Sequence, residues 1–144
     1  MALIEFKDLP DTSTPINAEN LNYNFDALKG KVLWTNPNSS SEFVKQTISL
    51  DLSKYRKLEI LYKIDVNNGT VVIQQLYKGI YGQVLCEVWL YDADLVLRRS
   101  AKFEDNGVEI DNCYGYGVGN HASQKGFVEN ANLGLIPYQI IGYE

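Results

Sequence analysis

Turn signals recur along most of this chain at intervals of about ten residues, and the segments between them alternate apolar and polar side chains. The alternation is clearest at 58–65, after which Asn67-Asn68-Gly69 leads into a second such segment at 70–77. The triplets at 92–94 and 105–107 mark two further turns. Alternation with a period of two predicts a strand with one buried face, and Asn-Gly favours a tight hairpin. Because parallel βαβ units would need helices between the strands, the sequence predicts a mainly β protein, either an antiparallel sandwich or a barrel. Of these two, we expect a β-sandwich of jelly-roll-like form.

The other strand-like segments extend this pattern from residue 31 to the end of the chain. They lie at 31–35, 43–52, 84–91, 95–104, 108–112 and 133–144. The segment 114–126 is rich in glycine and is interpreted either as a glycine-rich strand or as a loop. Its glycines lack the Gly-x-Gly-x-x-Gly spacing of a nucleotide-binding loop, so no nucleotide site is predicted. We therefore expect one β-sandwich domain over residues 31–144.

A single segment, 14–30, has the pattern of a helix. An asparagine at the N-cap and a glycine after the last turn mark its ends. Its apolar residues recur at steps of three, four and three and form one narrow seam, Ala18, Leu21, Phe25 and Leu28. A helix of about eleven residues is too short to be stable alone in water. The seam is therefore expected to pack either on the β-domain or on copies of itself in an oligomer.

The first residues, 1–13, are expected to form an extended arm, because their proline, aspartates and hydroxyl residues disfavour a helix. The segment has neither a basic start nor a continuous apolar stretch, so no signal peptide is predicted. No stretch of the sequence approaches the length of a membrane span. The expected organisation is an arm at 1–13, an oligomerisation helix at 14–30 and a β-domain at 31–144.

The charge and cysteine content narrow the classes of partner. The net charge is −5, which argues against nucleic acid and anionic membranes as partners, because no excess of basic residues exists to neutralise phosphates. The one basic pair, Arg98-Arg99, is interpreted as a solvated strand edge. Cys86 and Cys113 lack the spacing of a zinc site and are interpreted as small buried hydrophobic residues.

The chain shows no catalytic pattern, and we expect neither an enzyme nor a cofactor or metal site. His121 is the only histidine, and no Gly-x-Ser-x-Gly motif is present to supply a nucleophile. The acidic pairs Asp92 with Asp94 and Glu104 with Asp105 lie in turns, where acidic residues are common for reasons of turn geometry. A hydrolase acting on cell-surface polysaccharide would need two convergent carboxylates in a groove, and it ranks behind the non-enzymatic alternatives.

Aromatic residues suggest a second kind of function. The chain has ten tyrosines, a residue that suits both strands and hydrated interfaces. The segment 84–91 has no simply polar face, which a neighbouring subunit, a ligand or a second sheet would each explain. The candidate glycan contacts are Trp89, Tyr91, Tyr114 and Tyr116, although tyrosines in strands more often serve packing. The alternative function is thus a carbohydrate-binding module without an anchoring role.

The run Leu9-Pro10-Asp11-Thr12-Ser13-Thr14-Pro15-Ile16-Asn17-Ala18, within residues 4–22, resembles the N-terminal segment of tail-fibre, head-fibre and related minor structural proteins of phages and prophages of Gram-positive bacteria. The remainder is similar to their small C-terminal β-domains, with Val32-Leu33-Trp34-Thr35-Asn36-Pro37 at the start and 136–143 at the end. Many relatives carry a long shaft between arm and tip, whereas this chain has only 29–31 between helix and domain.

The resemblance implies a virion protein that is made in the host cytoplasm and forms a homotrimer. The arm would attach to other virion proteins, and the β-domain would project outward as a fibre tip, adaptor or decoration that contacts a host cell-surface polysaccharide. In that arrangement, the seam from Ala18 to Leu28 would lie near the three-fold axis.

Overall fold

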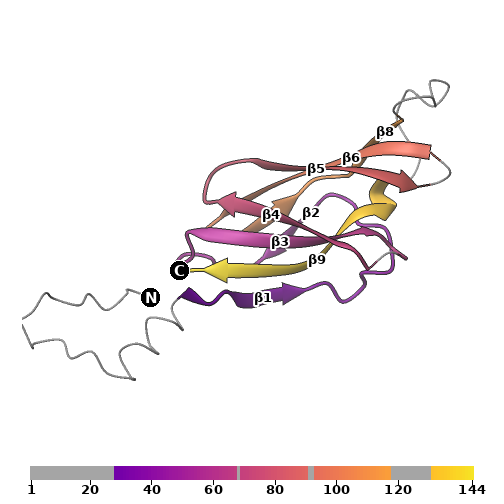
Figure 1. Cartoon of the computed structure of the whole chain (residues 1–144). Helices are drawn as coiled ribbons and strands as arrows, with labels where there is room; N and C mark the ends of the chain where they lie inside the picture. The colour runs from indigo at the N-terminus through magenta and orange to yellow at the C-terminus, as the bar shows by residue number, and fades with distance from the viewer. Residues whose placement is uncertain (1–27, 68, 91–92, 118–130) are drawn as a thin grey trace, which may run out of the picture.

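A computed structural model of the chain describes residues 28–67, 69–90, 93–117 and 131–144 (Figure 1). Its elements in chain order are β1 (Lys31–Thr35), β2 (Gln46–Ser49), β3 (Lys57–Asp65), β4 (Val71–Tyr77), β5 (Gly82–Leu90), β6 (Ala93–Glu104), β7 (Gly107–Ile110), β8 (Tyr114–Gly117), a 3₁₀ turn η2 (Ala131–Leu133) and β9 (Gly134–Tyr143). The predicted arm and the predicted helix up to residue 27 lie outside the described residues. Within the described parts, no helix is long and apolar enough to cross a membrane.

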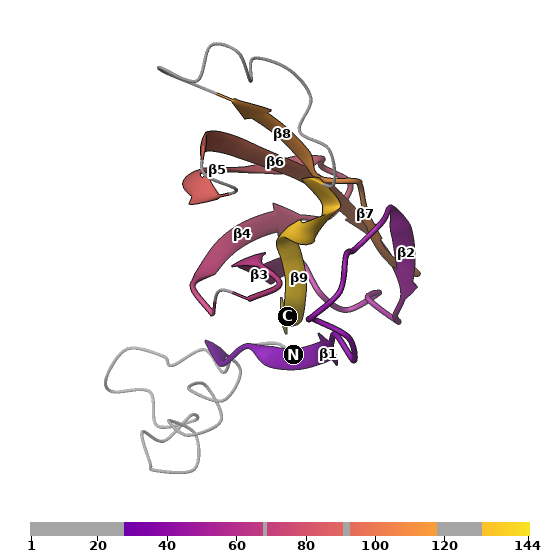
Figure 2. The same ribbon diagram turned by 90° about the vertical axis from the view of Figure 1, so that its right-hand side faces the viewer.

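The strands form two antiparallel sheets that lie one over the other (Figures 1 and 2). Sheet A has four strands in the order β1-β9-β3-β4. Sheet B has five strands, β2-β7-β6-β5 with β8 paired to β6 beyond the end of β7. Each of the pairings is antiparallel. The expectation of a mainly β, antiparallel protein is therefore confirmed.

The predicted hairpins form where the turn signals place them. β3 and β4 pair around the turn at 67–69, with Leu58 opposite Leu76 and Tyr62 opposite Val72. β5 with β6 and β6 with β7 form the two expected hairpins, although Ala93 and Asp94 of the predicted turn at 92–94 already belong to β6, opposite Leu90 and Trp89. Local alternation and turn chemistry therefore determine these three pairings.

Side chains from both sheets share one apolar core. Leu58, Ile60 and Tyr62 are alternate residues of β3 and each is 0% exposed. The sheet B side of this core comprises Ile48, Val84, Leu97, Ala101, Phe103, Val108 and Ile110. Burying one large apolar side chain contributes about 1.5–3 kcal/mol relative to leaving it in water. The shared core is therefore what holds the two sheets together.

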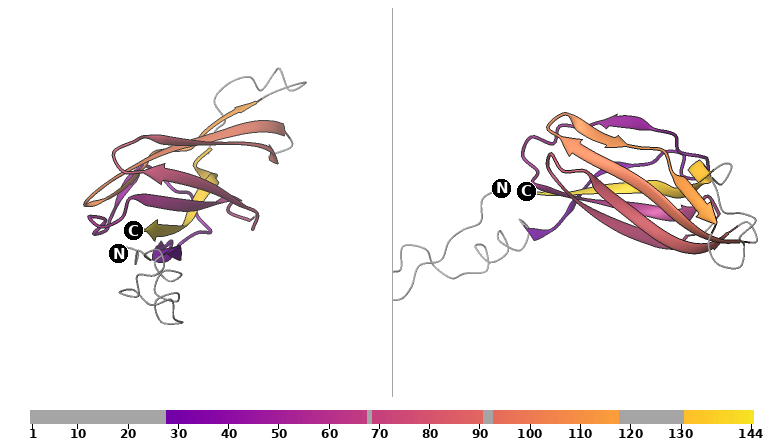
Figure 3. Two further views of the ribbon diagram at one scale, coloured as in Figure 1. Left: turned by 60° about the vertical axis from the view of Figure 1, so that its left-hand side comes forward. Right: turned by 90° about the horizontal axis from the view of Figure 1, so that it is seen from above.

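The described chain enters and leaves the domain at the same end. Lys31, at the start of β1, pairs with Gly142 near the end of β9, and Lys57 at the start of β3 pairs with Tyr143. At the opposite end, strands β3 and β5 finish and strands β4 and β6 begin (Figures 1 and 3). The described chain thus enters the domain at the end where β9 finishes, opposite the end where β3 and β5 finish.

The structure confirms some of the finer sequence-based interpretations and corrects others. The expected strand at 43–52 pairs only over Gln46–Ser49, because Phe43 packs into the core from a loop. Residues 114–117 of the glycine-rich segment form strand β8. The interpretation of Arg98-Arg99 as a solvated edge is wrong for Arg99, which is 0% exposed on an inner strand. Cys113 is buried, Cys86 is half-buried, and both are free thiols.

Candidate functional site: the cleft between β1 and β2

The predicted oligomerisation seam is described at one position only. Leu28 is 63% exposed, directly before the chain enters β1. Ala18, Leu21 and Phe25 lie outside the described residues. The proposed contact between copies of this helix therefore stays a prediction.

Two of the four candidate glycan contacts lie together on the outer face of sheet B. Tyr114 and Tyr116 are alternate residues of β8, opposite Arg98 and Val96 of β6. The Arg98 guanidinium carbon lies 5.3 Å from the centroid of the Tyr114 ring and 5.9 Å from that of Tyr116. The guanidinium of Arg98 is attracted by the ring quadrupoles. It therefore contacts the same two rings on which a sugar would have to stack.

The other two candidates are not described as side chains. The backbone of Trp89 belongs to β5 and pairs with Asp94. The side chain of Trp89 and the whole of Tyr91 lie outside the described parts of the chain. A glycan site that combines Tyr116 with these two residues stays a prediction.

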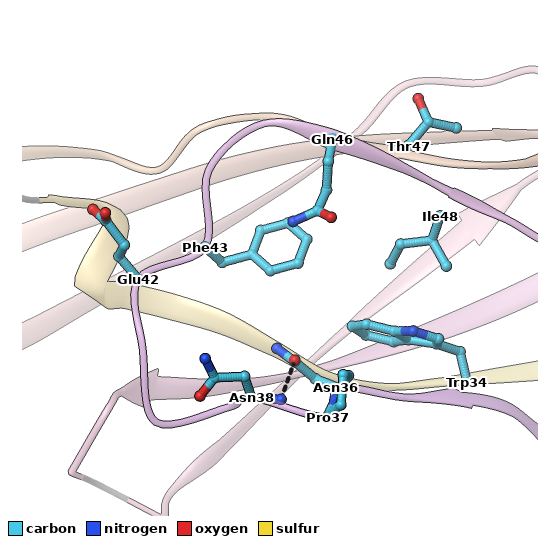
Figure 4. A pocket seen from close by; sticks show the side chains of 9 residues that line it. All are labelled: Trp34, Asn36, Pro37, Asn38, Glu42, Phe43, Gln46, Thr47 and Ile48. Carbon is cyan, nitrogen blue, oxygen red and sulfur yellow. Dashed lines mark hydrogen bonds between the residues drawn. The ribbon is translucent and has the colours of Figure 1, made fainter.

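A cleft that the sequence did not indicate opens where edge strand β1 of sheet A faces edge strand β2 of sheet B. It has a volume of about 390 Å³, within the range of small-ligand pockets. Its lining residues are Trp34, Asn36, Pro37, Asn38, Glu42, Phe43, Gln46, Thr47 and Ile48. In Figure 4 the Trp34 indole lies on the β1 side, Phe43 and Ile48 lie across from it, and the Thr47 side chain points away.

Asn36 fixes the β1 end of the cleft to the last strand. Its side-chain nitrogen donates a hydrogen bond of 2.8 Å to the carbonyl oxygen of Pro137, and its backbone nitrogen donates one of 2.9 Å to that of Tyr138. Its side-chain oxygen accepts a bond of 2.9 Å from the backbone nitrogen of Asn38. An asparagine that bonds its own backbone two residues on forms a tight, locally closed turn. This rim of the cleft is therefore held in place before any ligand arrives.

Phe43 is fixed on the opposite wall by a buried arginine. The Arg99 Nη1 atom donates a hydrogen bond of 3.0 Å to the Phe43 carbonyl oxygen, and the Phe43 nitrogen donates one of 3.0 Å to the Asn132 carbonyl oxygen. The Arg99 guanidinium carbon also lies 5.4 Å from the Phe43 ring centroid. Burial lowers the pKa of Arg99 below its ordinary value. The Phe43 ring thus has a defined position, with 5% of its surface exposed.

Three planar polar side chains reach the cleft with hydrogen-bonding capacity to spare. The Asn38 side-chain oxygen accepts a bond of 3.1 Å from the Ser41 hydroxyl, which leaves the amide nitrogen of Asn38 for another acceptor. Among the described residues, the amide nitrogen of Gln46 donates a single long bond, 3.4 Å to the Val44 carbonyl oxygen. The carboxylate of Glu42 has no partner among the described residues. The cleft lining therefore contains both hydrogen-bond donors and acceptors.

The lining contains a single titratable side chain, that of Glu42. Hydrolysis of a glycosidic bond requires a pair of carboxyl groups, so these lining residues suit binding. In the described part of the chain, no group of three or more His, Cys, Asp or Glu residues could hold a metal ion.

The sequence did not indicate the cleft, because the walls of the cleft come from two different sheets. A tryptophan followed by two asparagines was nevertheless a usable signal.

A comparison with family models, with curated proteins and with solved structures finds no match to this chain.

Proposed function

We propose that this chain is a non-enzymatic structural protein of a phage virion, a homotrimer that attaches to the particle through residues 1–13 and projects its β-domain outward. The observation that carries the proposal is an uncovered apolar strip on the outer side of sheet A. The resemblance of residues 4–22 to the N-terminal segments of such proteins supplies the assignment to a virion, and the strip supplies the reason to expect assembly.

The strip follows β4, the edge strand of sheet A. Val71, Ile73 and Tyr77 are 42%, 57% and 53% exposed, and we call these three residues the β4 strip. They alternate with Val72, Gln74 and Leu76, which face the core. Single exposed apolar residues are ordinary, whereas several on one face of a strand, here interrupted by the exposed Gln75, are typical of an interaction surface. An uncovered edge strand of this kind would also favour pairing between chains.

A further copy of the chain is the partner that best fits the β4 strip. Lys57 and Glu59 of β3 border it with charges of both signs and form an ion pair of 3.0 Å. In a trimer the β4 strip of one copy would pack on a different surface of the next copy, because a three-fold interface is heterologous, and these bordering charges would face that second surface. Sheet A also contains β1, so the sheet that bears the strip is the one that follows directly on the predicted helix.

The order of the strands supports a jelly-roll-like sandwich as the finer description of the fold. β1, β2 and β3 alternate between sheets A and B, and β9 returns to lie between β1 and β3. Alternation of this kind is how jelly rolls build two facing sheets from one chain. We take the sandwich as the projecting unit of the proposed virion protein.

The mass of the protein in solution tests the assembly directly. Light scattering on the full chain is expected to give three times the chain mass of 16.3 kDa. A mass of one chain that stays unchanged at high protein concentration would overturn the trimer. Binding of the full chain, but not of a chain lacking residues 1–13, to particles that lack this protein would test the role of the arm.

A carbohydrate-binding module without an anchoring role is the second candidate, and the pair Tyr114 and Tyr116 favours it. Their rings share one face of β8 with Arg98, an arrangement that could place a sugar ring beside a hydrogen-bond donor. A glycan array probed with the native chain and with Tyr116→Ala would test this site. Equal signals from the two proteins would exclude Tyr116 as a contact.

A further inference from the structure

We propose that the cleft between β1 and β2 binds a neutral saccharide, with one sugar ring lying against the indole of Trp34. The inference rests on the proposed function only for the source of the saccharide, a host surface. Binding itself requires one chain and no assembly. It assigns a ligand class to residues other than the four aromatic candidates of the sequence analysis.

Trp34 provides the apolar surface that a sugar ring needs. The indole packs against the core and remains half-buried, so part of it borders the cleft. Phe43 and Ile48 lie across the cleft from it (Figure 4). Sugar rings carry patches of C–H groups, and aromatic rings offer a large apolar surface of fixed orientation. A ring that enters here is therefore bordered by apolar groups on two sides.

The polar residues supply the complementary chemistry for hydroxyl groups. A hydroxyl group both donates and accepts, and planar amide and carboxylate groups can meet two adjacent hydroxyls at once. Asn38 and Gln46 offer amide groups with spare donors, and Glu42 offers a carboxylate that accepts only. A small number of placed polar groups beside an apolar wall is the usual composition of a small-molecule site.

Charge restricts the ligand class. The cleft lining contains one carboxylate and no lysine, arginine or histidine, and the whole chain has a net charge of −5. An anionic sugar or a phosphate polymer would meet Glu42 without a compensating cation, so we expect a neutral ligand.

The cleft is also organised in advance. Hydrogen bonds from Asn36 to β9 hold one rim, and the bond from Arg99 holds the carbonyl of Phe43 on the other wall. Lys63 Nζ donates a further bond of 3.1 Å to the carbonyl oxygen of Ser39 in the connecting loop. Walls that are fixed before binding lower the entropy lost when the ligand arrives. A site built in this way could hold a saccharide without refolding.

The test titrates the full chain with glucose, galactose, mannose, rhamnose and N-acetylglucosamine, and with disaccharides of each, by isothermal calorimetry and by saturation-transfer NMR. Glucuronic acid serves as the anionic comparison. At least one neutral sugar is expected to bind about tenfold more tightly than glucuronic acid, and Glu42→Gln is expected to narrow that difference. Failure of every neutral saccharide to bind the native chain, or tighter binding of the anionic sugar, would overturn the proposal.

Variants locate the site. Trp34→Ala and Gln46→Ala are each expected to weaken binding about tenfold or more. The matched controls are Gln83→Ala, which removes another exposed glutamine with one long bond (3.3 Å), and Glu87→Gln, which removes an exposed carboxylate on β5. Both controls should bind as the native chain does. Trp34→Ala also removes core packing, so the thermal unfolding of this variant is measured in parallel. If Trp34→Ala is unfolded, the binding measured for Gln46→Ala decides the outcome. Unchanged binding by Gln46→Ala and by a folded Trp34→Ala would overturn the site.

The same samples separate this inference from the assembly proposal. A trimer that binds no saccharide would overturn the cleft site and leave the assembly proposal standing. A monomer that binds saccharide at Trp34 would overturn the assembly proposal and leave the cleft site standing. Displacement of the sugar by a peptide from residues 1–27 of this chain would show that the cleft belongs to the chain's own N-terminal segment, and would overturn the proposal.

Discussion

The guanidinium of Arg99 lies 3.0 Å from the carbonyl oxygen of Phe43, a residue 56 positions earlier in the chain. Two further carbonyl oxygens accept hydrogen bonds from the same group, that of Asp111 at 2.6 Å and that of Gly134 at 3.1 Å. These three acceptors belong to the loop before β2, the residue after β7 and the first residue of β9. One buried side chain therefore joins three separate segments, one of which forms a wall of the cleft.

The substitution Arg99→Lys is expected to lower the free energy of unfolding by about 3 kcal/mol, because a single ammonium group cannot reach three carbonyl oxygens and buried acceptors would lose their donors. Urea denaturation at pH 7 would measure the loss. Arg98→Lys is the matched control, since Arg98 is half-buried on the outer face of the same strand, and its effect should stay within about 0.5 kcal/mol. Equal stability of the two variants would contradict the role of Arg99.

The buried pair Tyr62 and Gln74 offers a test of hydrogen-bond satisfaction in the core. The Tyr62 hydroxyl donates a bond of 2.7 Å to the side-chain oxygen of Gln74, and burial raises the pKa of Tyr62 above its ordinary range. The amide nitrogen of Gln74 is buried and has no partner among the described residues. The side-chain oxygen of Gln74 thus has a hydrogen-bond donor, whereas its amide nitrogen has no acceptor among the described residues.

Tyr62→Phe is expected to cost about 2 kcal/mol, because it leaves the buried oxygen of Gln74 without a donor. The double variant Tyr62→Phe with Gln74→Leu should recover most of that loss, since both polar partners are then replaced by apolar groups of similar shape. Denaturation curves of the native chain, both single variants and the double variant complete the cycle. A double variant as unstable as the sum of the two single variants would show that the hydroxyl and the amide do not interact.

Acid sensitivity is expected from the pair Glu59 and Tyr143. The Tyr143 hydroxyl donates a bond of 2.7 Å to the Glu59 carboxylate, and this bond, with help from Lys57 and Gln75, holds the pKa of Glu59 below its ordinary value of 4.5. A carboxyl group whose pKa is lower in the folded state stabilises the fold above the unfolded pKa. That contribution is lost as the pH falls through the folded pKa.

Tyr143→Phe should therefore lower the free energy of unfolding by about 1 kcal/mol at pH 7, and the difference from the native chain should shrink below about pH 4.5. Tyr138→Phe, in the same strand, is the control and should show no such pH dependence. Denaturation series from pH 2.5 to pH 7 measure both. A Tyr143→Phe deficit that stays constant over this range would show that the bond does not depend on the ionised carboxylate.

The hairpins could be predicted from the sequence because their determinants are local. In β3 and β4, the alternation of side chains and the asparagine and glycine of the turn lie within one short segment. The placement of β9 between β1 and β3 has no such local signal, because the partners of Ile140 come from strands more than seventy residues earlier. Strand order depends on which surfaces meet in the whole chain, and one sequence window does not contain that information.

Leu135 shows how tertiary burial overrides a local preference. It adopts a φ of 45°, a left-handed conformation that favours glycine, although Gly134 is the adjacent residue. This conformation costs about 1–2 kcal/mol for a residue with a Cβ atom. The Leu135 side chain is 0% exposed, and such burial contributes about 1.5–3 kcal/mol, so the packed side chain offsets the backbone cost. A reading of turn residues alone would place the left-handed residue at the glycine.

The cleft escaped prediction for a related reason. Trp34 and Phe43 appeared in the sequence as part of one strand and the start of another, with a polar turn between them. They line one site because β1 and β2 belong to different sheets and because Arg99 holds the loop at Phe43. The sequence shows the residue types of such a site but not which of them will face each other.

The β4 strip is the most direct test of how copies of the chain meet. Ile73→Lys would place an unpaired charge in the proposed interface, where its desolvation costs several kcal/mol, so the trimer is expected to dissociate. Leu85→Lys is the matched control, because Leu85 is 60% exposed on the outer face of β5 in sheet B, close to the 57% of Ile73. Light scattering over a series of protein concentrations would give the mass of both variants.

The predicted helix makes an independent contribution to the same assembly. Leu21→Asp or Phe25→Asp would bury a carboxylate at every copy of a shared seam and should also disperse the oligomer. Dispersal by the helix variants with no effect of Ile73→Lys would show that the β4 strip is not part of the interface. Dispersal by Ile73→Lys alone would show that the helix packs on its own β-domain, the alternative that its sequence pattern leaves open. Ile73 is exposed outside the apolar core, so a native circular dichroism spectrum is expected for Ile73→Lys, and the spectrum of every variant is recorded to separate loss of assembly from loss of fold.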